Sequence, residues 1–182
     1  MNQYPNAAAG LRLMFVGQML VIVGVLLAWV PFVGALLIIA SPVVEIIGVY
    51  KAGNDDENYR GALVFAVLVL AVNLISGLFG EGLLSSLLDV ASEVLSLLVV
   101  FTVCSTTSNL LHSIGQEVLS QRGGTVVKIY TACTAISIVC QVLGIIPIIN
   151  IAAAVVNGIA GLVAVAGYIM YLLFLYSGSK VL

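Results

Sequence analysis

Residues 13–44 read LMFVGQMLVIVGVLLAWVPFVGALLIIASPVV and contain no Asp, Glu, Lys, Arg or His. Three more stretches share this property, at residues 61–80, 94–111 and 129–179. A membrane-spanning helix needs about 20 mostly apolar residues. The second and third stretches each hold one such helix. The fourth is long enough for two helices with a turn, and so is the first if its second helix continues to Tyr50.

The composition of the whole chain supports a membrane protein. Of its 182 residues, 62% are hydrophobic and 8% are charged, whereas soluble domains carry roughly 45–50% apolar and about 25% charged residues. Too few polar side chains remain to cover a water-exposed surface, and the high hydrophobicity excludes a disordered chain. Six Lys and Arg against eight Asp and Glu give a net charge of −2, which offers no basic surface for nucleic acid. We expect an integral protein of the cell or cytoplasmic membrane, with the lipid bilayer as its surroundings.

Two prolines predict the turns within the long uncharged stretches. Pro31 lies 19 residues after Arg12, and Pro147 lies 19 residues after Lys128. At 1.5 Å per residue this separation is about 28 Å, close to the thickness of the hydrocarbon core. A kinked helix of the full length would overshoot the bilayer about twofold, so tight hairpins are favoured.

The predicted fold is therefore all-α and polytopic, with about six transmembrane helices arranged as three helical hairpins in a single domain, 1–182. The three hairpins cover residues 11–51, 60–113 and 125–176. The individual helices are expected at 11–29, 33–51, 60–79, 90–113, 125–145 and 151–176. A short tail would precede the first helix at 1–10, and a short interfacial stretch would run from Glu81 to Glu93. Five spans with one re-entrant segment are the alternative.

The basic residues predict the orientation, because cytoplasmic loops are enriched in Lys and Arg. In the three-hairpin arrangement all six fall on one side of the membrane: Arg12, Lys51, Arg60, Arg122, Lys128 and Lys180. We therefore expect both termini in the cytoplasm. Two connections on that side are polar. Residues 52–59 form a short, acidic, solvated loop, and residues 113–125 are interpreted as a helical extension ended by Gly123 and Gly124.

Glu45 is the clearest polar group at membrane depth. It lies six residues before Lys51, about 9 Å deeper than the interface. Folding the first hairpin at Pro31 places Gln18 at nearly the same height. A hydrogen bond between the two side chains is one interpretation, and a carboxylate lining a cation or proton path is the other.

The second hairpin carries more polar residues. Asp89 and Glu93 are spaced i, i+4 on the fourth segment, so the two like charges repel unless a cation or proton intervenes. Asn73 and Ser76 on the third segment fall near the height of Glu93 when the hairpin closes. The pattern fits either a solvated interfacial helix or an acidic vestibule, in which Glu93 would repeat as a cation-selective ring in a homo-oligomer.

The third hairpin is polar but uncharged at membrane depth. Thr134, Ser137 and Gln141 share one stripe, and folding at Pro147 places Ser137 near Asn157. Such pairs are mostly interhelical hydrogen bonds. The last helix also carries small residues at three- and four-residue spacing, which indicate close packing within the bundle or an interface between copies.

No motif of nucleophilic, metal-dependent or phosphate-binding catalysis occurs, so no catalytic, cofactor-binding or metal-binding residue is expected. Cys104, Cys133 and Cys140 are interpreted as packing residues and His112 as an interfacial one. The first functional hypothesis is a homo-oligomeric channel or small transporter for cations or small solutes. Its candidate pathway residues are Gln18, Glu45, Asn73, Asp89 and Glu93. The alternative is a non-catalytic scaffold or an accessory subunit of a larger membrane complex.

Overall fold

The computed structural model describes residues 3–30, 32–79, 82–144 and 150–182, and the regular structure within them is α-helical. Along these residues run α1 (Pro5–Leu26), α2 (Val33–Ala52), α3 (Tyr59–Ser76), α4 (Leu83–Ser113), α5 (Glu117–Gly144) and α6 (Asn150–Val181). In the described part of the chain, six helices are long and apolar enough to cross a membrane. The prediction of an all-helical chain with six apolar helices is confirmed, and it is compatible with a multi-pass membrane protein.

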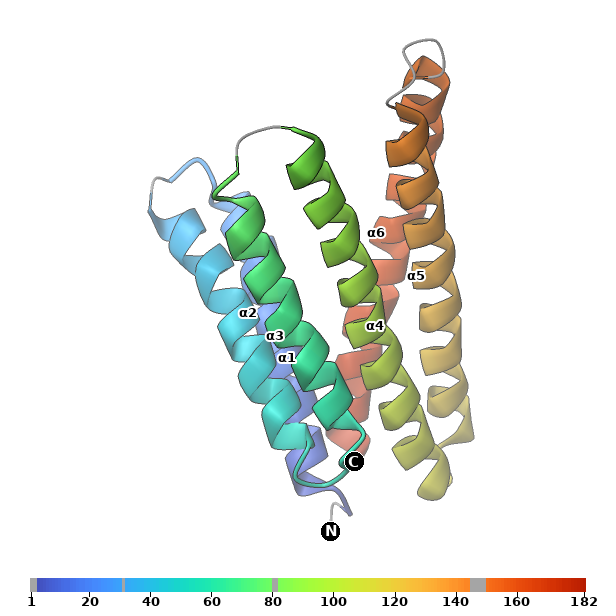
Figure 1. The fold of residues 1–182 in the computed structure, drawn as a ribbon. Coiled ribbons are helices and arrows are strands. Elements are labelled where there is room, and N and C mark those ends of the chain that lie inside the picture. The colour runs from blue at the N-terminus through green and yellow to red at the C-terminus, as the bar shows by residue number, and fades with distance from the viewer. Residues whose placement is uncertain (1–2, 31, 80–81, 145–149) are drawn as a thin grey trace.

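The helices are arranged as a ring in sequence order. Each helix packs against the next one along the chain, and α6 returns to contact α1. Figure 1 shows both chain ends at one end of the bundle, which we call the terminal end. There the backbone N–H of Tyr4 donates a hydrogen bond to the carbonyl oxygen of Leu182 over 3.1 Å. The helices α1, α3 and α5 finish at the opposite end, the hairpin end, where α5 and α6 extend beyond α1–α3 (Figure 1).

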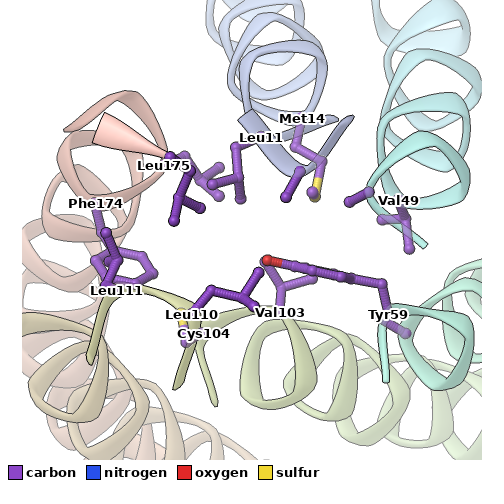
Figure 2. Packing of buried hydrophobic residues seen from close by; sticks show 14 of the residues in the cluster. Leu11, Met14, Val49, Tyr59, Val103, Cys104, Leu110, Leu111, Phe174 and Leu175 are labelled. Atoms are coloured by element: carbon purple, nitrogen blue, oxygen red, sulfur yellow. The ribbon is translucent and has the colours of Figure 1, made fainter. Parts of the chain in front are cut away.

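Large apolar side chains fill the interior of the ring at the terminal end. Figure 2 shows them converging from α1, α2, α3, α4 and α6. The members below 2% exposure include Leu11, Val49, Tyr59, Val103, Leu111, Phe174 and Leu175. Each of these residues lies in the part of its helix that is nearest the terminal end. The outer surface is apolar as well, with Leu36 66% and Leu162 75% exposed, as a lipid-facing surface requires.

The hairpin of α1 and α2 is held by three layers of small residues. On each helix these residues are seven positions apart, which keeps them on one face. The layers pair Gly10 with Gly48, Gly17 with Ser41, and Gly24 with Gly34. A Cβ atom built on Gly10 would lie 2.5 Å from the Gly48 carbonyl oxygen, and one on Gly24 would lie 3.1 Å from that of Gly34. Only small side chains let two helix backbones approach so closely.

Two predicted boundaries are wrong. The expected tail at 1–10 is largely helical, because α1 begins at Pro5, and proline is favoured in a first helical turn. The expected interfacial stretch of residues 81–93 is not a separate segment, since α4 is continuous from Leu83 to Ser113. Pro31, Glu81 and Pro147 lie outside the described residues.

The connections at the terminal end also differ from expectation. Asp55 accepts hydrogen bonds from the Ala7 backbone N–H at 2.8 Å and from Asn6 Nδ2 at 2.7 Å, so the acidic loop caps the start of α1. Gly123 and Gly124 do not end a helix but lie inside α5. A Cβ atom on Gly123 would lie 2.8 Å from the Phe174 ring, so this glycine lets α6 approach. The turn itself contains Gly115, whose φ is +78°.

Candidate functional site

Glu45 lies at the middle layer of the α1–α2 contact. Ser41, one helical turn earlier, donates a hydrogen bond from its Oγ to Glu45 Oε1 over 3.1 Å. A Cβ atom built on Gly17 would lie 2.6 Å from Glu45 Cγ. The absence of a side chain at Gly17 therefore leaves room for the Glu45 side chain against α1.

Glu45 opens onto a cavity in the interior of the ring, which we call the Glu45 cavity. Its volume is about 380 Å³, and its lining comes from α1, α2, α3, α4 and α6. The polar members are Gln18, Glu45, Asn73, Ser96 and Tyr171. Three of the five residues proposed from the sequence are thus brought together here, although they come from three helices.

Gln18 lies beside Glu45, as the fold-back at the first hairpin predicted. The hydrogen bond that the Glu45 carboxylate accepts comes from the Ser41 hydroxyl, on the same helix as Glu45. The backbone of Gln18 contacts α6, because Tyr168 donates its hydroxyl hydrogen to the Gln18 carbonyl oxygen over 3.1 Å. This bond connects α6 to α1 at the height of the cavity.

Pro42 is a feature of the cavity that sequence reasoning missed. It lies inside α2 and lines the cavity together with Ile38. Proline has no backbone N–H, so the carbonyl of the residue four positions earlier, Ile38, loses its usual helical donor. The signal was present in the sequence as a proline three residues before Glu45.

Asn73 and Asp89 connect α3 to α4. Ser92 donates its hydroxyl hydrogen to Asn73 Oδ1 over 2.7 Å, and Ser76 donates to Asp89 Oδ1 over 3.0 Å. The predicted closeness of α3 and α4 at this height is confirmed. The sequence predicted Asn73 and Ser76 near the height of Glu93, and the residues of α4 that they contact there are Ser92 and Asp89.

Glu93 faces away from α3 and toward α5. Its Oε1 accepts a hydrogen bond from Gln141 Nε2 at 2.6 Å and one from Ser137 Oγ at 3.4 Å. Asp89 and Glu93 therefore do not form one acidic pair. Asp89 is exposed and hydrogen-bonded to Ser76 on α3, whereas Glu93 is hydrogen-bonded to Gln141 on α5. The physical reason is that α4 lies between α3 and α5, and each carboxylate reaches the nearer donor.

Glu93 lines a second cavity of about 200 Å³ between α4, α5 and α6, which we call the α5–α6 cavity. Thr134, Ser137 and Asn157 line the same space, so the predicted approach of Ser137 to Asn157 is present. Within the described residues, Glu93 Oε2 is buried and has no hydrogen-bond partner.

Basic side chains are absent from the described lining of both cavities, and the three cysteines are buried. In the described structure neither cavity has Lys or Arg in its lining. Cys104, Cys133 and Cys140 are buried, with free thiols, which fits the packing role expected of them. No group of three His, Cys, Asp or Glu side chains able to hold a metal ion is found among the described residues.

The chain matches no protein-family model, no curated protein and no solved structure. The geometry of the two cavities is therefore the ground for a functional assignment.

Proposed function

We propose that this protein is a small membrane transporter that binds a cation or a small cationic solute in the Glu45 cavity. The observation that carries the proposal is the convergence of Gln18, Glu45 and Asn73 on one cavity of about 380 Å³. Typical ligand pockets have volumes of roughly 300–1,000 Å³, so a small solute fits this space.

The sign of the charge supports a positively charged solute. An ionisable side chain at membrane depth is costly and faces a partner or a water-filled path. In the described lining of the Glu45 cavity, Glu45 is the one charged side chain. A bound cation would supply the missing countercharge. The side-chain oxygens of Gln18 and Asn73, which line the same cavity, are suitable ligands for this cation.

The packed core supports a transporter over an open channel. Leu11, Tyr59 and Val103 fill the ring between the cavity and the terminal end, and each is fully buried. A solute in the cavity would pass this core only after the helices move, as in alternating access. The cavity is built within one chain, so binding does not require the homo-oligomer considered above.

The orientation that we propose places the terminal end in the cytoplasm. All six basic residues lie on helix segments toward that end: Arg12, Lys51, Arg60, Arg122, Lys128 and Lys180. Lys and Arg are enriched on the cytoplasmic side of membrane proteins. The Glu45 cavity would then lie on the outer side of the packed core.

Uptake into proteoliposomes tests the proposal. The purified chain is reconstituted, and accumulation of radiolabelled methylammonium and of ²²Na⁺ is measured against protein-free vesicles. We expect uptake of at least one of these probes and a loss of about tenfold or more in Glu45→Gln, which keeps the shape and removes the charge. Glu57→Gln is the matched control, because the Glu57 side chain is 83% exposed and lies far from the cavity in the loop before α3. Equal uptake by Glu45→Gln and the unaltered protein would refute the proposal.

A second candidate, an accessory subunit, is favoured by one surface of α6. Gly158 and Gly161 have no described heavy atom near the position of an added Cβ, so the ring does not use their small size. A partner helix could pack closely there. If this candidate is correct, Gly158→Leu lowers the amount of a co-purified membrane partner, whereas Gly124→Leu on α5 does not. Purification of the unaltered protein alone from native membranes would refute it.

A further inference from the structure

The two oxygen atoms of Glu93 have different surroundings. Oε1 receives hydrogen bonds from Gln141 at 2.6 Å and Ser137 at 3.4 Å. Oε2 is buried and makes no hydrogen bond within the described residues. Burying a carboxylate oxygen without a hydrogen-bond partner is energetically unfavourable. A group that neutralises the Glu93 carboxylate is therefore expected near it.

No basic side chain of the described structure supplies this neutralisation. Among the described residues the one ion pair is Arg60 with Glu57, at the protein surface. Lys128 is the basic residue of α5 nearest in sequence, nine residues before Ser137, which is about 13 Å along the helix axis. It is exposed and lines a separate, apolar cavity. The countercharge at Glu93 would have to come from outside the chain.

The α5–α6 cavity has the donors that a hard cation prefers. Thr134, Ser137 and Asn157 line it together with Glu93, and each of these side chains carries an oxygen atom. Carboxylate, hydroxyl and amide oxygens are the usual ligands of alkali and alkaline-earth cations. Glu93 is the one charged residue in the described lining. A monovalent cation would leave the site neutral, whereas a divalent cation would leave an uncompensated positive charge at membrane depth.

We infer that the α5–α6 cavity is a second site, separate from the Glu45 cavity, in which Glu93 binds a monovalent metal cation such as Na⁺. The candidate ligands are the Glu93 carboxylate and the side-chain oxygens of Thr134, Ser137 and Asn157, which line the cavity. Gln141 positions the carboxylate by occupying Oε1. The site is described by its own residues on α4, α5 and α6, so it does not depend on the function proposed for Glu45.

Thermal unfolding of the purified full-length chain tests this inference. NaCl is titrated against choline chloride at constant ionic strength, because choline is too large for a metal-cation site. A ligand that binds only the folded state raises the unfolding midpoint with concentration. We expect a saturable rise in the unaltered protein and an apparent affinity at least tenfold weaker in Glu93→Gln. A midpoint insensitive to NaCl, LiCl and KCl in the unaltered protein would overturn the inference.

Two matched variants distinguish this site from the others. Asp89→Asn removes a charge one turn away on the same helix, at an exposed position bonded to α3, and should keep the Na⁺ response. Glu45→Gln should still show a saturable Na⁺ response, because Glu93 is unaltered, even where it abolishes solute uptake. Loss of the Na⁺ response in Glu45→Gln with retention in Glu93→Gln would overturn the assignment to Glu93.

A chemical measurement on the unaltered protein covers the case in which Glu93→Gln does not fold. Dicyclohexylcarbodiimide adds to protonated carboxyl groups in apolar surroundings, and the adduct is located by peptide mass spectrometry. Bound Na⁺ keeps the carboxylate deprotonated, so we expect NaCl to protect Glu93 and choline chloride not to protect it. Equal modification of Glu93 in both salts would indicate a proton-binding group and contradict a metal-cation site.

Discussion

Gly10 and Gly48 lie back to back across the α1–α2 contact, and a methyl group on Gly10 would approach the Gly48 carbonyl oxygen to 2.5 Å. The reverse substitution is equally restricted, since a Cβ atom on Gly48 would lie 2.8 Å from the Gly10 carbonyl oxygen. Both obstacles are backbone atoms, which cannot move aside without separating the two helices. The layer therefore fixes the distance between α1 and α2, and with it the position of Glu45 relative to Gly17.

Gly48→Ala should consequently destabilise the protein by about 1–3 kcal/mol, the usual cost of overpacking. Resistance to unfolding by SDS in mixed micelles measures the effect. The control is Gly124→Ala in α5, where an added Cβ meets no described atom within 4 Å. The control should be neutral or slightly stabilising, because alanine favours the helix over glycine by about 1 kcal/mol. Two variants that change stability alike would show that the α1–α2 contact is looser than described.

The cap that Asp55 provides for α1 predicts a second effect on stability. Asp55→Ala removes an anionic acceptor from the Ala7 N–H and from the positive end of the helix dipole. We expect a loss of about 0.5–2 kcal/mol in the free energy of unfolding. In the same loop, Glu57→Ala breaks only an exposed ion pair with Arg60 and should cost less than about 1 kcal/mol. A larger loss for Glu57→Ala than for Asp55→Ala would contradict the assignment of the cap.

Tyr59 and Thr107 predict a coupled pair. Their hydroxyl oxygens are 2.7 Å apart, and both side chains are fully buried between α3 and α4. In a double-mutant cycle of Tyr59→Phe and Thr107→Val, we expect each single variant to leave one hydroxyl without its partner. The two effects should then be non-additive by about 0.5–1.5 kcal/mol. Strict additivity would mean that the hydrogen bond contributes nothing to stability.

The orientation predicts a labelling pattern. Asn54→Cys, in the α2–α3 connection, should react with a membrane-impermeant maleimide only after the cells are made permeable. Leu78→Cys, just after α3, should react in intact cells. The native background is low because the three native cysteines are buried. The inverse pattern would reverse the proposed orientation, and labelling of both positions from one side would exclude a membrane-spanning α3.

The helices were predictable from the sequence because their cause is local. An uncharged run of sufficient length must cross the bilayer as a helix, since no water is present to satisfy its backbone. The level of each side chain along the helix axis was also predictable, because it follows from the local position of the turn. A hairpin folded at a known turn brings Gln18 level with Glu45 and Ser137 near Asn157, whatever the remaining helices do.

The rotation of each helix was not predictable in this way. Whether Glu93 meets Ser76 or Gln141 depends on which helices flank α4 in the ring. Hydropathy does not report that arrangement, because the lipid-facing and buried faces are equally apolar. Gly123 was misinterpreted for a related reason. In the sequence, a glycine that ends a helix cannot be told from one that lets a neighbouring helix approach. The contact between Gly123 and Phe174 in the structure distinguishes the two cases.

The unequal helices of the ring have a consequence for the surrounding lipid. α3 has 18 residues and α6 has 32, which correspond to about 27 Å and about 48 Å of helix. The turns of α6 toward the hairpin end carry exposed valines and isoleucines, such as Val155 and Ile159, each 60% exposed. A flat bilayer of even thickness cannot cover these turns and still match α3. We therefore expect the molecule to tilt, or to collect long-chain lipids beside α5 and α6, so that acyl-chain length becomes a variable that sets its stability.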